Sequence, residues 1–233
     1  MLDLSSVTLI CADSVFVPET IRSFERCKAV AKFGAVKLLT DVNIDYEHVV
    51  KIPRLNSHIE YSIFCLKRLH EFVETPHMLI AQHDSWIINP QAWDVNWLKY
   101  GFIGPLYIHQ HEIRDLSVGT GGFSLRHRDL MAHVSDLSPQ WDHCNPESTR
   151  TVQDALGCYE DGAISFLYRR QLESKGFVFA PPNEAAKFAQ GGNTDPNYWV
   201  ERPFGFHGLW SNIDKDSGIV SPFAPREGSY GHI

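Results

Sequence analysis

Apolar and polar residues alternate in blocks along the first eighty residues. Three continuous apolar runs have the length of strands: VTLICA (residues 7–12), VKLLTD (36–41) and HMLIAQ (77–82). Runs of this kind are typical of strands buried on both faces of a parallel sheet. The first run is short and no basic residues precede it, so we expect a first strand there rather than a signal peptide.

Two amphipathic stretches separate these strands. Residues 18–33 begin with Pro18, which suits a first helical turn, and Gly34 is expected to end that helix. Ser57 and Glu60 have the spacing of a capping box at the start of a second helix. The apolar faces consist of Ile21, Phe24 and Ala31 in the first helix, and of Ile59, Ile63, Leu66 and Val73 in the second.

This order of elements predicts an α/β fold with a doubly wound, mixed but mostly parallel sheet flanked by helices. In such sheets, ligands bind beyond the carboxyl ends of the strands. Asp13, Asp41 and Asp84 each follow one of the three strands. We therefore expect these carboxylates at the edge of the sheet where a ligand binds.

The second half has a less regular pattern. Strands are expected at residues 101–106, at 118–126 (where glycines interrupt the run) and at 177–180. Helices are expected at 128–134 and 158–176, the second of them closed by Gly176. The apolar face of that second helix consists of Ile164, Leu167, Tyr168 and Leu172.

Composition and charge narrow the class of protein. The chain has 233 residues, of which 43% are hydrophobic, and no linker divides it, so we predict one domain over residues 1–233. A net charge of −7 without a block of basic residues argues against a nucleic-acid partner. No apolar stretch approaches the roughly 20 residues that span a bilayer. Five widely spaced cysteines without a CxxC motif indicate a reducing compartment, and we expect a cytoplasmic protein.

Asp84, in the segment Gln82-His83-Asp84, can hold a divalent cation, whose preference for oxygen ligands suits a diphosphate; the alternative is a residue that only starts a turn. Gly119, Gly121 and Gly122 indicate either a close approach of a ligand to the backbone or a structural bulge.

Two later segments carry further candidates. Glu160 and Asp161 precede a helix, where a carboxylate can act as a general base but also commonly caps the helix. His207 lies among aromatic residues and glycines and is by itself more typical of a structural residue. The segment with His109, His111 and Glu112 could suggest zinc, although a further ligand is not identified; its histidines could also line an acceptor cleft.

Taken together, the motifs resemble a known family. LIAQHDSWIINP, GFIGPL, VGTGGFSLR, YEDGAIS and PFGFHG, in this order, are similar to a bacterial and viral family of GT-A-type glycosyltransferase-like domains of long-unassigned function. The resemblance covers about residues 7–210. It implies a nucleotide-sugar-binding half (7–106), an acceptor-binding and catalytic half (107–210) and a C-terminal tail (211–233).

The resemblance also assigns roles to residues. Asp84 matches the metal-binding carboxylate of the family's DxD motif, whereas Gln82 replaces its first acidic residue, which puts the need for a metal in doubt. Asp161 matches the catalytic base, with Glu160 beside it, and His207 matches a late metal ligand. The donor-binding positions implied by the resemblance are Ala12, Asp13, Asp41, Gln82, His83, Asp84, Gly121 and Gly122.

The function implied is transfer of a sugar from a nucleotide-sugar donor to a hydroxyl of a glycan or glycolipid acceptor. The transfer is expected to invert the anomeric centre with the assistance of Mn²⁺ or Mg²⁺, in the synthesis of a surface polysaccharide. Aromatic candidates for stacking on sugar or base are Trp86, Phe123, Phe206 and Trp210, all of which could instead pack in the core. Two alternatives remain: a catalytically silent nucleotide-sugar- or glycan-binding module, and a sugar-phosphate nucleotidyltransferase.

Overall fold

A six-stranded mixed sheet forms the centre of the computed structural model, which describes residues 1–106, 118–137, 159–191 and 198–208. The strand order is β3-β2-β1-β4-β6-β5. β1, β2, β3 and β4 pair in parallel with one another, whereas β6 runs antiparallel to both β4 and β5. The strands are β1 (Leu2–Ala12), β2 (Ala31–Thr40), β3 (Val49–Lys51), β4 (His77–Ala81), β5 (Phe102–Ile103) and β6 (Phe123–His127). The predicted fold class is confirmed.

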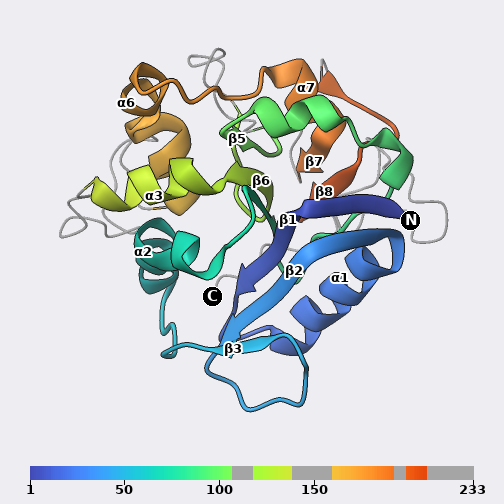
Figure 1. Ribbon diagram of the computed structural model, residues 1–233, viewed down its shortest axis with the longest axis vertical. Coiled ribbons are helices and arrows are strands. Elements are labelled where there is room, and N and C mark those ends of the chain that lie inside the picture. Colours follow the sequence, from blue (N-terminus) through green and yellow to red (C-terminus); the bar gives the residue numbers. More distant parts are fainter. Residues whose placement is uncertain (107–117, 138–158, 192–197, 209–233) are drawn as a thin grey trace, which may run out of the picture.

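Helices cover both faces of the sheet. The longer ones are α1 (Val17–Val30), α2 (His58–Arg68) and α3 (Arg128–Asp136), and the shorter ones are η1 (Leu69–Phe72), η2 (Pro90–Ala92), η3 (Val95–Lys99), α6 (Arg169–Ser174) and α7 (Pro182–Phe188). Figure 1 shows α1 on one side of the sheet and α2, α3 and α6 on the other.

Alternating residues of the central strands supply two hydrophobic clusters. Leu9 and Leu79 belong to the cluster that α1 covers, whereas Ile10 and Ile80 belong to the cluster on the side of α2 and α3. Side chains of successive strand residues point to opposite faces, and both faces of these strands are buried here. The continuous apolar runs in the sequence are the consequence.

The helix predicted to end at Gly34 ends earlier, and this expectation was wrong. α1 ends at Val30, and Gly34 lies inside β2, next to the register shift between Leu4 and Thr8 of β1. A Cβ atom at Gly34 would lie 2.2 Å from the carbonyl oxygen of Ser5. The glycine therefore allows two strands to approach closely and does not terminate a helix.

The start of α2 agrees with the predicted cap. The Ser57 side chain accepts a hydrogen bond from the Glu60 amide at 3.1 Å. The Glu60 carboxylate accepts from the amide of Asn56 at 2.8 Å, one residue earlier than in a standard capping box. Short strand β3 was not predicted, because three residues give little periodicity.

The second half departs more from the prediction. The glycines predicted to interrupt a strand instead precede it, because β6 begins only at Phe123. The helix predicted at 158–176 consists of α5 (Glu160–Gly162), a π-helical segment η6 (Ala163–Leu167) and α6. Leu167, expected on the buried face, is 57% exposed, because the wider π turn changes which residues face the core.

A two-stranded parallel sheet completes the described structure. It consists of β7 (Ala189–Gly191) and β8 (Gly205–His207), and Ile87 forms an isolated bridge with Gly205. The strand expected at 177–180 is reduced to one bridge between Phe102 and Phe179. Within the described ranges, no helix is both long and apolar enough to cross a membrane.

Candidate active site

Asp84 and His207 come together from two sheets. Asp84 follows β4, and His207 is the last residue of β8. Nε2 of His207 lies 3.5 Å from Oδ1 of Asp84. The side chain of His207 is 28% exposed, and that of Asp84 is 15% exposed. Oδ1 of Asp84 is buried and has no hydrogen-bond partner among the residues that the structure describes. An acceptor of this kind, next to an imidazole nitrogen, is suited to a cation.

The two residues before Asp84 have other contacts. Nε2 of Gln82 donates a hydrogen bond to the Tyr61 hydroxyl at 2.8 Å. The ring of His83 stacks on Phe16 with 4.3 Å between ring centroids. Of the segment Gln82-His83-Asp84, only Asp84 therefore faces His207.

Gly121 and Gly122 separate two groups of site residues. A Cβ atom at Gly122 would lie 2.1 Å from Nε2 of His207, and one at Gly121 would lie 2.4 Å from Oε1 of Glu160. The Gly122 carbonyl oxygen also accepts hydrogen bonds from the Gln82 amide and the Ser85 hydroxyl. Only glycine fits at either position without moving these neighbours, so a single pair of backbone residues separates His207 from Glu160.

Asp161 is held by two backbone amides. Its Oδ2 accepts a hydrogen bond from Gly121 at 2.7 Å, and its Oδ1 accepts one from Gly162 at 2.7 Å. The residue at the cap position of α5 is Tyr159, and no side chain caps the helix there. Asp161 thus lies inside the first turn, with its carboxylate directed to the glycine segment.

Glu160 points into the protein. Its side chain is 3% exposed and forms an ion pair with the fully buried Arg126, with 2.9 Å between Oε1 and Nη2. Burial raises the pKa of Glu160, while the charge of Arg126 opposes the rise. Arg126 was not among the predicted site residues; the signal in the sequence was an arginine within a short strand, FSLRH, that is expected to be buried.

Asp13 organises the turn between β1 and α1. Its Oδ1 accepts hydrogen bonds from the amides of Val15 and Phe16 at 2.8 and 2.9 Å, and its Oδ2 accepts one from the Thr20 hydroxyl. Both carboxylate oxygens are therefore used by the chain itself. The preceding Ala12 is buried and pairs with β2.

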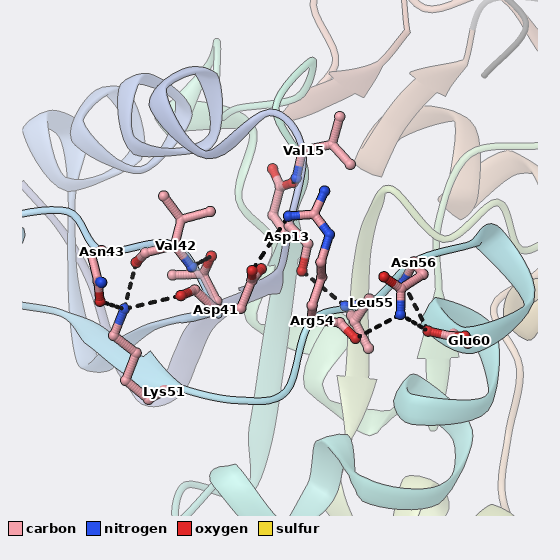
Figure 2. A network of polar contacts seen from close by, with 12 residues as sticks. Asp13, Val15, Asp41, Val42, Asn43, Lys51, Arg54, Leu55, Asn56 and Glu60 are labelled. Atoms are coloured by element: carbon pink, nitrogen blue, oxygen red, sulfur yellow. Dashed lines mark hydrogen bonds and ion pairs between the residues drawn. The ribbon is translucent and has the colours of Figure 1, made fainter.

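Asp41 lies near basic side chains at the end of β2. Figure 2 shows the Arg54 guanidinium turned toward Asp41, with 3.4 Å between Nη1 and Oδ2. The Ser14 hydroxyl, together with the positive charge of Arg54, lowers the pKa of Asp41. The Lys51 ammonium donates to the carbonyl oxygens of Asp41 and Val42. This strand end carries both charges, which suits a polar ligand.

The donor set fits a cation only in part. Two ligands at right angles on Mg²⁺ lie about 3 Å apart, close to the separation of Asp84 and His207. However, no cluster of three or more metal-ligating side chains occurs within the described ranges. Two protein ligands are compatible with a cation that keeps waters or is shared with a diphosphate.

The other candidates either pack in the core or cannot be placed. Trp86, Phe123 and Phe206 are buried. The ring of Trp86 packs edge-on against that of Phe206, with 4.5 Å between ring centroids. The residues that lie outside the described ranges are His109, His111, Glu112, Trp210 and the tail at 211–233.

The fold is that of GT-A-type glycosyltransferases. The chain is similar to a glycosyltransferase involved in glycosylation of the major capsid of PBCV-1 (11% identity, TM-score 0.51), over 88% of this chain and 93% of that one. It is equally similar to the galactosyltransferase LgtC in complex with donor and acceptor sugar analogues (11% identity, TM-score 0.51), over 93% of this chain and 91% of that one. At this identity the likeness shows the fold alone.

The family is shown by sequence. Residues 44–207 match the family described as "Protein of unknown function (DUF5672)", and the chain belongs to it. No curated protein matches the chain in sequence.

Proposed function

We propose that this protein is a glycosyltransferase that transfers a sugar from a nucleotide-sugar donor to a hydroxyl of a glycan or glycolipid, with inversion. The observation that carries the proposal is the placement of Asp161 and of the pair Asp84–His207 around Gly121 and Gly122. A base and a candidate leaving-group site therefore lie close together. Inverting transfer needs these two functions on opposite sides of the anomeric carbon.

In the proposed reaction, Asp161 removes the proton of the acceptor hydroxyl. The hydroxyl oxygen forms a bond to the anomeric carbon, and the bond from that carbon to the diphosphate breaks with its electron pair on the diphosphate. The amides of Gly121 and Gly162 need not move during the reaction, because they already orient the Asp161 carboxylate. Such preorganisation lowers the cost of reaching the transition state.

Asp84 and His207 are the residues that would hold Mn²⁺ or Mg²⁺. A bound cation would neutralise charge that develops on the leaving diphosphate. The unpaired, buried oxygen of Asp84 supports this role. Because Gln82 replaces the first carboxylate of the related motif and binds Tyr61, we propose that this chain contributes only these two ligands.

The donor nucleoside is proposed to lie near the ends of β1 and β2, at Ala12, Asp13 and Asp41. The polar groups at Asp41 and Arg54 support this position (Figure 2). We further propose that the protein is cytoplasmic and acts in polysaccharide synthesis. The free, buried thiols of Cys11 and Cys27 are compatible with a reducing compartment.

The test is incubation of the purified chain with a panel of nucleotide sugars, with and without Mn²⁺. A transferase releases nucleoside diphosphate slowly by hydrolysis and faster with an acceptor. Thermal stabilisation by a nucleotide sugar without any turnover would instead indicate a binding module. Release of pyrophosphate from a nucleoside triphosphate and a sugar phosphate would indicate a nucleotidyltransferase. NMR of the transferred sugar decides between inversion and retention.

A further inference from the structure

A closed ring of polar contacts lies behind Asp161. The Gly121 amide donates to Asp161, and the Gly121 carbonyl oxygen accepts from the Ser124 hydroxyl at 2.7 Å. The same Ser124 oxygen accepts from Nε of Arg126 at 2.9 Å. Nη2 of Arg126 then donates to Glu160 at 2.9 Å, and Glu160 precedes Asp161 in the chain. The ring therefore joins β6 to the first turn of α5.

The ring is buried at the side away from Asp161. Ser124 and Arg126 are fully buried, and the Arg126 guanidinium lies 4.9 Å from the centre of the Phe102 ring. Nη1 of Arg126 and Oε2 of Glu160 have no hydrogen bond to any described residue. Replacement of a buried ion pair by apolar side chains of similar volume is often neutral or even stabilising. Stability alone is thus a poor explanation for these charges.

Two nitrogen atoms of the Arg126 guanidinium donate hydrogen bonds in this arrangement. Nε fixes Ser124, and through it the Gly121 peptide that binds the Asp161 carboxylate. Nη2 fixes Glu160, and through it the backbone position of Asp161, and also donates to the Gly121 carbonyl oxygen at 3.4 Å. A planar guanidinium can hold both partners at once, whereas an ammonium group cannot reproduce the fork.

We propose that Arg126, acting through Ser124 and Glu160, is a positioning residue that sets the location of the Asp161 carboxylate during glycosyl transfer. This inference rests on the proposed function, in which Asp161 is the base. It assigns to Glu160 a role in positioning rather than in proton transfer.

Replacement of only one charge is an ambiguous test, because the other charge would be left buried and unpaired. The decisive variant is the double replacement Arg126→Met/Glu160→Met, which removes both charges and keeps long side chains. We expect it to unfold near the wild-type denaturant midpoint. Its kcat should fall about 10–100-fold, with the donor KM within about threefold of wild type, because misplacement of a base affects the chemical step. A double variant with wild-type kcat would overturn the proposal.

Two milder variants keep the test decisive if the double variant does not fold. Ser124→Ala removes the hydroxyl that bridges Arg126 and Gly121 and leaves only the longer contact, 3.4 Å, between Nη2 and the Gly121 carbonyl oxygen. Arg126→Lys keeps a charge opposite Glu160 but loses the fork. We expect both to fold, and each to lower kcat about three- to tenfold with an unchanged donor KM. Wild-type kcat in both would show that the ring is only structural.

Arg169 provides the matched control. It is also buried, pairs with a glutamate (Glu173, 2.9 Å) and lies 4.7 Å from the ring centre of Phe179, but forms no hydrogen bond or ion pair with Gly121 or Asp161. Arg169→Met should lower stability and leave kcat unchanged. An equal loss of kcat in Arg169→Met would mean that general loosening, not positioning, causes the effect.

A second measurement does not depend on activity. Hydrogen exchange of the Gly121 amide should be slow in the wild type, and faster in Ser124→Ala while the other β6 amides keep their protection. If no donor in the panel is turned over by the wild type, the proposed function fails. Faster exchange at Gly121 would then still support the positioning of Asp161, and unchanged exchange would overturn it.

Discussion

Asp13 and Asp84 both follow a parallel strand of the same sheet, yet their carboxylates have different surroundings. Both oxygens of Asp13 accept hydrogen bonds from the turn that begins α1. Asp84 keeps a buried oxygen without a hydrogen-bond partner among the described residues, 3.5 Å from His207. The position at a strand end does not by itself fix the surroundings of a carboxylate: the loop after β1 donates to both oxygens of Asp13, whereas one oxygen of Asp84 receives no hydrogen bond from the described residues.

The same comparison applies to the two halves of the chain. In the first half, the carboxylate of Asp13 is bound by residues two to seven positions away. In the second half, Asp161, Glu160 and His207 are bound or approached by residues 34 to 123 positions away, as in the pairs Glu160–Arg126 and His207–Asp84. Contacts between distant segments assemble the candidate site, whereas local contacts assemble the turns.

The largest expected effect comes from Asp161→Asn. Loss of a general base should lower turnover about 10²–10⁴-fold, with little change in donor affinity. Steady-state kinetics with the donor found in the panel measure both quantities. Asp129→Asn is the control, because Asp129 is also an acidic residue in the first turn of a helix, α3, but is exposed. Retention of anomeric configuration in the wild type would contradict the assignment of Asp161.

The next effect is expected at the proposed cation site. Asp84→Asn and His207→Ala should each raise the Mn²⁺ concentration for half-maximal turnover at least about tenfold, because each changes a proposed ligand and even the loss of a group that only supports a ligand costs about 10–100-fold in metal affinity. Titration of turnover with Mn²⁺ gives the apparent affinity. Asp94→Asn is the control, since Asp94 caps η3 through the Asn96 amide. Unchanged Mn²⁺ dependence in both test variants would remove the pair from the site.

A smaller effect, on stability, is expected for Asp13→Ala. The variant loses hydrogen bonds from two amides and a hydroxyl, so the free energy of unfolding should fall by about 1–2 kcal/mol. Denaturant unfolding measures the change, and Asp13→Asn should lose less because its amide oxygen still accepts from the turn. A loss of donor binding in Asp13→Asn without any loss of stability would show that Asp13 contacts the donor directly and not through the turn that it organises.

The smallest effect is a pH dependence at Asp41. Its pKa is lowered in the folded protein, so the unfolded state binds the proton more tightly. The resulting stabilisation is present above the unfolded pKa and is lost as the pH falls through the folded pKa. In Asp41→Asn, the denaturant midpoint should change less between about pH 5 and pH 3 than in the wild type. Identical pH profiles would show that Asp41 is not coupled to Ser14 and Arg54.

The sequence predicted the first half well because its pattern is local. Strand runs, the Ser57 cap and the strand-end carboxylates each depend on residues a few positions apart. The helix boundary near Gly34 was misjudged because this glycine is needed for the close approach to Ser5 of a neighbouring strand and not for the end of a helix. Features that depend on residues close in sequence were thus predictable, whereas contacts between strands were not.

The candidate site was predictable in its residue types but not in its assembly. The family resemblance pointed to Asp84, Asp161 and His207, and the structure describes where each one lies. Arg126 was not predicted, because the sequence of a single strand does not show that its partner, Glu160, lies 34 positions later. The π turn after Asp161 likewise has no marked sequence signal, and it exposed Leu167.

For protein redesign, Gly121 and Gly122 act as a spacer of fixed thickness. Any side chain at Gly122 would meet His207, and any side chain at Gly121 would meet Glu160, so neither position offers room for variation. A library that randomises this pair should yield almost no active clones. Changes at the proposed donor site are better sought at Arg54, whose side chain is 58% exposed and lies in no such narrow gap.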